Sequence, residues 1–69
     1  MLCNRVRELR ARFRWTQADL AKRIGATRQT VGMIEKEDYA PSVTLALKIA
    51  KEFELSLEEV FWLEGGDRK

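Results

Sequence analysis

The sequence contains no histidine, one cysteine and one proline among its 69 residues. Without histidine and with a single cysteine, the chain lacks the ligand sets of ordinary zinc sites and the side chains of most nucleophilic catalysis. The lone Cys3 cannot form an internal disulfide, so a reducing, cytoplasmic setting fits. We therefore expect no enzyme activity, no metal, no other cofactor and no small-molecule ligand.

Long apolar runs are also missing, because no stretch approaches the roughly 20 residues that a membrane helix needs. The first residues, MLCNRVRELR, lack the apolar centre of a signal peptide. With 45% hydrophobic and 35% charged residues, the composition is that of a globular protein rather than a disordered one. We expect one domain, residues 1–69, whose small core gains stability from a second subunit.

The net charge of +2 hides an uneven distribution along the chain. Residues 1–36 carry nine basic and three acidic side chains, a net charge of +6, whereas residues 37–69 carry four and eight, a net charge of −4. A basic half suggests a polyanionic partner, although solvated helix faces explain the charge equally well. The charge distribution alone does not distinguish a polyanion-binding face from solvated helix faces, so the distinction rests on sequence motifs.

Apolar residues at helical spacing predict five short helices, and capping residues mark where they begin. Thr16 and Thr27 precede the second and third helices, Ser56 precedes the fifth, and Gly25 ends the second. The predicted helices cover approximately residues 4–13, 17–24, 28–36, 43–53 and 56–61.

The most informative segment is TQADLAKRIGATRQTVGMIEKE, residues 16–37. Two short helices joined by a tight turn at Gly25-Ala26-Thr27 have the spacing of a DNA-binding helix-turn-helix at about residues 16–36. A generic helical hairpin is the alternative, and the outward face of the second helix distinguishes the two.

That outward face carries an arginine, a glutamine and a glycine, with no acidic residue before Lys36. Arginine can pair with guanine O6 and N7, and glutamine with adenine N6 and N7, while methyl groups can contact thymine. We predict that the residues contacting bases are Thr27, Arg28, Gln29 and Met33.

Phosphate contacts are expected around this face, because the N-terminus of a helix presents free N–H groups and partial positive charge. Gln17 begins the second helix and is the first candidate. For Lys36 and Tyr39 a role in solvent is nearly as well supported. The further phosphate candidates are Arg14, Lys36, Tyr39, Ser42 and Thr44.

Two opposite charges, Arg10 and Glu35, fall on the apolar stripes of the first and third helices. Burying either one alone would be expensive, so we predict that they form a structural ion pair. The alternative is that both side chains extend to water.

Trp62 and Leu63 are apolar residues that follow the last predicted helix, so something must cover them. Two candidates are the N-terminal Leu2-Cys3, as a short paired strand, and a second subunit.

The segment 16–37, followed by Pro41-Ser42 and LALKIAKEFELSLEEVF, resembles the Cro/C1-type helix-turn-helix family, also called the XRE family, over about residues 4–61. The resemblance implies an all-α, five-helix, lambda-repressor-like fold. It also implies a sequence-specific regulator of transcription, and its smallest members indicate a repressor that binds a roughly palindromic operator as a homodimer.

The resemblance carries the same roles onto the residues named above. It assigns a phosphate to Gln17, bases to the start of the third helix, and a buried pair to Arg10 and Glu35. It further implies that Leu2-Cys3 pairs with Trp62-Leu63 as a short antiparallel ribbon. The dimer interface that it implies consists of Leu57, Phe61, Trp62 and Leu63.

The sequence departs from the family pattern at two positions. Glu37 stands after the third helix, where many members have Gly or Asn, so either strain is accepted there or Asp38 takes the turn. Met33 replaces a residue that is often polar in the family.

An alternative function of the same fold is a protein-interaction module that binds an antitoxin-like or anti-repression partner.

Overall fold

The computed structural model describes residues 1–64, and the end of the predicted domain, residues 65–69, lies outside this part. The prediction of five helices with a short antiparallel strand pair is confirmed. No helix within residues 1–64 is long and apolar enough to cross a membrane. In chain order the elements are β1 (Leu2–Asn4), α1 (Val6–Arg12), α2 (Gln17–Ile24), α3 (Arg28–Glu35), α4 (Val43–Glu52), α5 (Leu57–Val60) and β2 (Phe61–Leu63).

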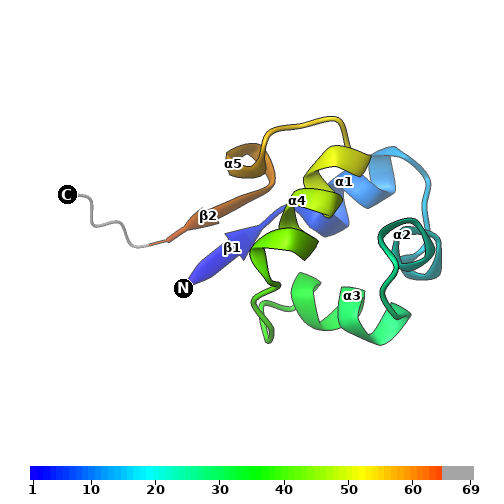
Figure 1. Cartoon of the computed structure of the whole chain (residues 1–69), viewed down its shortest axis with the longest axis horizontal. Coiled ribbons are helices and arrows are strands. Elements are labelled where there is room, and N and C mark those ends of the chain that lie inside the picture. The colour runs from blue at the N-terminus through cyan, green and yellow to red at the C-terminus, as the bar shows by residue number, and fades with distance from the viewer. Residues whose placement is uncertain (65–69) are drawn as a thin grey trace.

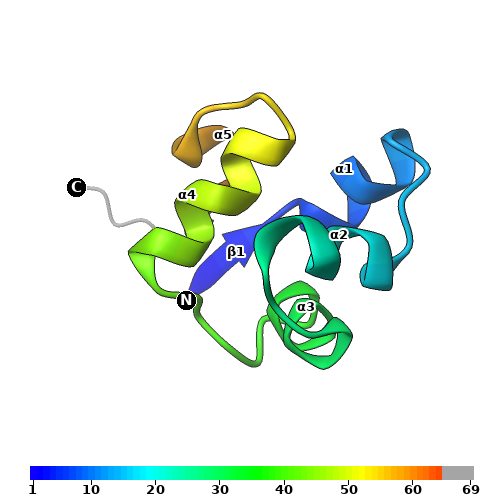
Figure 2. The same cartoon turned by 45° about the vertical axis from the view of Figure 1, so that its right-hand side comes forward.

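The two ends of the described chain meet in the ribbon β1–β2, which extends from one side of the helices (Figure 1). Cys3 pairs with Trp62, and Asn4 pairs with Phe61. This pairing moves two predicted boundaries, because Asn4 is a strand residue rather than the start of a helix, and Phe61 is extended rather than helical. Helix α3 lies on the side away from α5, with α2 beside it (Figure 2).

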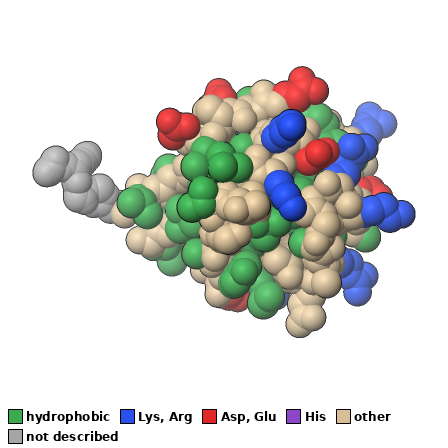
Figure 3. All heavy atoms as spheres, in the orientation of Figure 1, with side chains coloured by type: hydrophobic (Ala, Val, Ile, Leu, Met, Phe, Trp, Pro, Cys, Tyr) green, Lys and Arg blue, Asp and Glu red, His purple; other side chains and the backbone are tan. Residues whose placement is uncertain are grey.

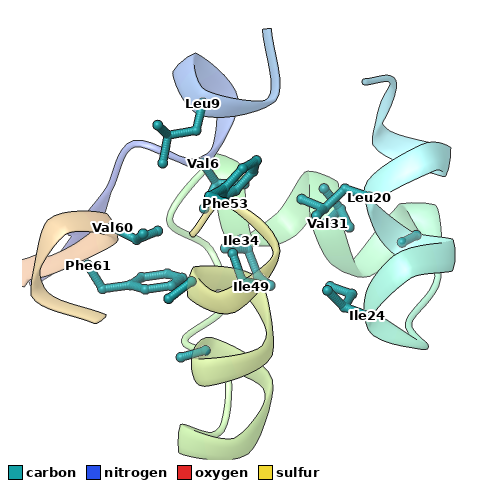
Figure 4. Packing of buried hydrophobic residues seen from close by; sticks show 13 residues of the cluster. Val6, Leu9, Leu20, Ile24, Val31, Ile34, Ile49, Phe53, Val60 and Phe61 are labelled. Atoms are coloured by element: carbon teal, nitrogen blue, oxygen red, sulfur yellow. The ribbon is translucent and has the colours of Figure 1, made fainter. Parts of the chain in front are cut away.

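The core lies where α1, α2, α3, α4 and α5 converge (Figure 4). Its fully buried side chains include Leu20 from α2, Val31 and Ile34 from α3, and Ile49 from α4. Because Val31 and Ile34 point inward, the opposite side of α3 is left to solvent. Phe13, at the C-terminal end of α1, is 40% exposed, and its ring packs at the edge of the core against Trp15 and Phe53.

Reciprocal hydrogen bonds close the first turns of two helices. The Thr16 N–H donates to Asp19 Oδ2 at 2.8 Å, and the Asp19 N–H donates to Thr16 Oγ1 at 3.0 Å. At α5 the Ser56 N–H donates to Glu59 Oε1 at 2.8 Å. The backbone donors favour the ionised carboxylates, so they lower the pKa of Asp19 and the pKa of Glu59.

These lowered pKa values predict how stability depends on pH. A carboxylate with a lower pKa in the folded state stabilises the fold above its unfolded pKa, about 4, and loses this contribution as the pH falls through the folded pKa. We expect the free energy of unfolding to decline below about pH 4, and to decline less steeply in the double variant Asp19→Asn/Glu59→Gln. Urea titrations followed by circular dichroism, repeated at several pH values, measure the free energy of unfolding of each protein. An equally steep decline with falling pH in the two proteins would contradict the lowered pKa values of Asp19 and Glu59.

Three helices end in a left-handed residue that is not glycine. These residues are Arg14 after α1 (φ 60°), Glu37 after α3 (φ 64°) and Glu54 after α4 (φ 59°). At α3 the Asp38 N–H donates to the Met33 carbonyl at 3.0 Å and the Glu37 N–H to the Ile34 carbonyl at 2.9 Å, which is a Schellman motif. The turn therefore falls on Glu37 and not on Asp38.

Glycine at these positions is expected to stabilise the protein, because only glycine adopts positive φ without a steric penalty. Glu37→Gly and Glu54→Gly should each raise the free energy of unfolding by about 1 kcal/mol, the lower end of the left-handed penalty. Lys48→Gly, in the exposed interior of α4, is the matched control and should lower it by about 1 kcal/mol. Denaturant titration of the three variants measures whether the free energy of unfolding rises or falls in each. A loss of stability in Glu54→Gly would show that the left-handed conformation of Glu54 carries no steric penalty.

Candidate nucleic-acid interface

A tight turn of three residues sets the angle between α2 and α3. Gly25 ends α2 in the left-handed conformation (φ 71°), which lets the Ala26 N–H donate to the Ala21 carbonyl at 2.9 Å. Thr27 then caps α3, where its Oγ1 accepts from the Thr30 N–H at 3.1 Å. The two helices are in extensive contact, so the turn and the packing together hold α3 in one orientation.

All four residues predicted to contact bases lie on the exposed side of α3 or at its cap. Thr27, Arg28 and Gln29 are exposed at the N-terminal end, and Met33 follows one turn later. The first turn of α3 contains no acidic residue, so the positive charge of Arg28 is not neutralised within its own turn. The face therefore combines flexible donors with the positive end of a helix.

A buried carboxylate holds α3 from behind. The side chain of Glu35 is 5% exposed and that of Arg10 is 17% exposed. Arg10 Nε donates to Glu35 Oε2 at 2.7 Å, and Arg10 Nη2 donates to Glu35 Oε1 at 3.2 Å. Arg10 also donates through Nη1 to the Trp15 carbonyl at 3.0 Å. This bidentate pair joins α1 to α3 and orients the guanidinium.

The same carboxylate also binds Gln17, a contact that the sequence analysis missed. Gln17 Nε2 donates to Glu35 Oε1 at 3.1 Å, so Glu35 connects α1, α2 and α3. One N–H of the amide is therefore occupied, and the other has no acceptor among residues 1–64. A carboxylate can accept several hydrogen bonds, so the sequence left room for Glu35 to bind a second side chain besides Arg10. Nothing else in the sequence pointed to Gln17 as that partner.

The predicted phosphate candidates divide between two surface hollows and a loop. Arg14, Gln17 and Arg28 line the first hollow, at the start of α2. Gln17 and Lys36 line the second, beside the middle of α3. The remaining candidates are exposed between α3 and α4 or in the first turn of α4; they are Tyr39, Ser42 and Thr44. Ser42 also caps α4, where its Oγ accepts from the Leu45 N–H at 3.1 Å.

The candidates for a dimer interface differ in how much surface they offer. Phe61 is 6% exposed and packs in the core of its own chain, and Leu57 is half-buried against the same core. Trp62 and Leu63 lie exposed on β2, with Leu63 at 74%. Two apolar residues of α4, Val43 and Leu47, are also exposed and were not among the predicted interface residues.

Charge separates the two ends of the molecule. On the face shown in Figure 3, Lys and Arg side chains lie over α2 and the later part of α4, whereas hydrophobic side chains gather toward the ribbon and the start of α4. Within residues 1–64, no group of three or more Cys, Asp or Glu side chains is arranged to hold a metal ion. The basic end is thus next to α3, and the apolar end is remote from the first turn of α3.

Comparisons with known proteins agree with this geometry. A helix-turn-helix family profile matches residues 6–60. The HTH-type transcriptional regulator YgzD of Bacillus subtilis is 59% identical over 88% of this chain and 92% of its own length. The regulator MJ0272 of Methanocaldococcus jannaschii is 48% identical over the same shares of the two chains. The antitoxin HipB of Escherichia coli is 36% identical over 81% of this chain and 60% of its own.

Solved structures share the fold. The P22 c2 repressor, solved in complex with a synthetic operator, superimposes with a TM-score of 0.76 at 24% identity, covering 78% of this chain and 82% of that chain. A protein from Bacteroides fragilis superimposes with a TM-score of 0.78 at 21% identity, covering 88% of this chain and 98% of that chain. The lambda-repressor-like fold that the sequence predicted is therefore confirmed, and the chain belongs to the Cro/C1-type (XRE) helix-turn-helix family of transcriptional regulators.

Proposed function

We propose that this protein is a sequence-specific regulator that binds double-stranded DNA and represses transcription as a homodimer. The observation that carries the proposal is the outward face of α3, where Arg28 and Gln29 are exposed while Val31, Ile34 and Glu35 anchor the opposite side. The P22 c2 repressor, which shares the fold, was solved with its operator, and this supports the same mode of binding. We expect a cytoplasmic protein that needs no cofactor.

In this proposal α3 enters the major groove with its N-terminal end toward the base edges. Arg28 donates two hydrogen bonds to a guanine, and Gln29 donates to and accepts from an adenine. Thr27 Oγ1 is engaged by the cap and by the Thr30 hydroxyl at 3.0 Å, so its methyl group is the part left to contact a thymine. Met33, one turn along, contacts a second methyl.

Phosphate contacts fix the position of α3 in the groove. Gln17 is the central residue, because Glu35 orients its amide and leaves one N–H free at the start of α2. Arg14, Lys36, Tyr39, Ser42 and Thr44 extend the contacts on both sides of α3. These contacts supply affinity that falls steeply with salt.

A two-fold dimer would place two copies of α3 in successive major grooves, about 34 Å apart, on a palindromic site. The exposed apolar residues Trp62 and Leu63 on β2, together with Leu57, are the proposed interface. Phe61 contributes indirectly, because its side chain supports the ribbon from the core. An exposed apolar end on a chain of this size is the feature that a second copy would cover.

Selection from a pool of random duplexes tests the function directly. We expect enrichment of a palindrome whose half-sites are about 10 base pairs apart. Sedimentation of the protein with and without the selected duplex then reports whether it is a dimer. No enrichment at low salt, together with a protein that co-purifies from the host, would favour the protein-interaction alternative.

Gln17 and Gln29 should differ in how they affect binding. Gln17→Ala is expected to weaken binding to the selected operator and to a random duplex by the same factor, because a phosphate contact carries no base information. The loss of one hydrogen bond to a charged group corresponds to about 1.5–3 kcal/mol. Gln29→Ala should instead reduce the preference for the operator. Fluorescence anisotropy measures the affinity for the operator and for the random duplex, and hence the ratio of the two affinities. A changed ratio in Gln17→Ala would contradict the assignment of Gln17 to a phosphate.

A further inference from the structure

Gly32 occupies the middle of α3, where glycine weakens a helix relative to alanine. Its φ is not positive, since Gly25 is the glycine of the described chain with a left-handed backbone. A Cβ built on Gly32 would meet Gln17 side-chain atoms at 3.6–3.9 Å, which is ordinary van der Waals contact. Neither the backbone nor the packing within the described chain accounts for a glycine here, and its effect is to leave the α3 backbone uncovered at this point.

Gly32 lies in the second hollow described above, whose lining includes Arg7, Arg10, Gln17, Glu35 and Lys36. Arg10 and Glu35 neutralise each other through their bidentate pair. Arg7 and Lys36 are exposed, and neither forms an ion pair with a residue of the described chain. Three cations and one carboxylate give the hollow a net charge of +2. The hollow is therefore a concave, positively charged site with a free amide donor.

We infer that this hollow seats one phosphate of the DNA backbone, with Gly32 as its floor and Arg7 and Lys36 as its cations. The inference rests on the proposed DNA binding; it adds Arg7 to the interface and gives Gly32, already on the outward face of α3, a role at the DNA backbone. The absence of a side chain at Gly32 lets the strand lie against the α3 backbone. Glu35 orients the Gln17 amide at the rim of the same hollow, so its free N–H can donate to the seated phosphate.

The position of Arg7 relative to α3 supports this assignment. Arg7 lies on α1, one turn before Arg10, whereas Lys36 ends α3, so two different helices each bring one cation to the hollow. Two cations at one concave site suit a tetrahedral anion better than either cation alone. Helix α1 would thereby bind the DNA strand that borders the groove occupied by α3.

Charge removal on α1 provides the first test, with a matched control on the same helix. Arg12 has the same charge as Arg7 but pairs with Glu8 at 2.7 Å and lines a different hollow beside Leu55 and Glu59. Arg7→Gln should lower the slope of log affinity against log salt by about one unit, whereas Arg12→Gln should leave it nearly unchanged. The probe is the duplex selected by the unsubstituted protein, with a random duplex in parallel. Equal slopes in the two variants would overturn the assignment of Arg7.

Gly32→Ala provides the second test, because its two expected effects have opposite signs. The melting temperature should rise by about 4 °C as helix propensity improves. The affinity for both duplexes should fall several-fold, because the added methyl group fills the floor of the seat. A raised melting temperature with unchanged affinity would overturn the role of Gly32. If the unsubstituted protein binds DNA but both tests fail, the seat is wrong and the proposed function stands; if it binds no duplex, both are wrong.

Discussion

Replacing Glu35 with alanine is expected to lower the free energy of unfolding by about 3–5 kcal/mol, the typical result of removing one partner of a buried ion pair. The Arg10 guanidinium would remain largely enclosed, at 17% exposure, without its carboxylate. Gln17 would lose its acceptor as well, so three helices would lose a common connection. Small domains lie near the lower end of the usual range of stability, about 5–15 kcal/mol, so a large part of the fold's margin depends on this contact.

Urea titrations measure this loss, and the chain supplies its own control. Arg12→Ala removes an exposed ion pair with Glu8, which should change stability by no more than about 0.5 kcal/mol. The double variant Arg10→Met/Glu35→Leu replaces both buried charges by apolar groups of similar size and should recover much of the stability. If Glu35→Ala behaves like Arg12→Ala, the buried pair does not orient α3.

Removing both long polar side chains at the start of α3 should nearly abolish sequence-specific binding. Each bidentate base contact is worth about 1–3 kcal/mol, so Arg28→Ala/Gln29→Ala should weaken operator binding by about thirtyfold or more. The fold should be unaffected, because both side chains are exposed and neither caps a helix. Anisotropy titrations at fixed salt measure the affinity, and circular dichroism checks the fold.

Lys51→Ala is a suitable control for the double variant, since it also removes one positive charge. Lys51 lies in the last turn of α4 beside Lys22 and Lys48, in a hollow that does not include α3. It should reduce binding to all duplexes slightly and equally. An Arg28→Ala/Gln29→Ala protein that keeps its preference for the operator would show that other residues read the sequence.

Local signals predicted α2, α3 and α4 to within one residue or so, because each is bounded by a capping residue or by the chemistry of a turn. The start of α1 and the end of α5 were misplaced because Asn4 and Phe61 belong to a strand pair between the two ends of the chain. Helical periodicity extends through both residues and contains no information about a partner strand so far away in sequence.

The pairing of Arg10 with Glu35 could be anticipated because two opposite charges interrupt two apolar stripes. Other features of the site could not, since they depend on how helices lie against one another. The bond from Gln17 to Glu35 and the approach of Arg7 to the middle of α3 arise only when α1, α2 and α3 are packed. The burial of Phe61 likewise follows from the extended backbone that carries it into the core.

Amide chemical-shift changes during titration with the selected duplex test the central claim most directly, because they locate the bound surface residue by residue. The account predicts the largest changes in residues 28–33 of α3 and at the start of α2, with small changes in the outer part of α5. Changes confined to α5 and the ribbon, with the first turn of α3 unperturbed at saturation, would contradict it.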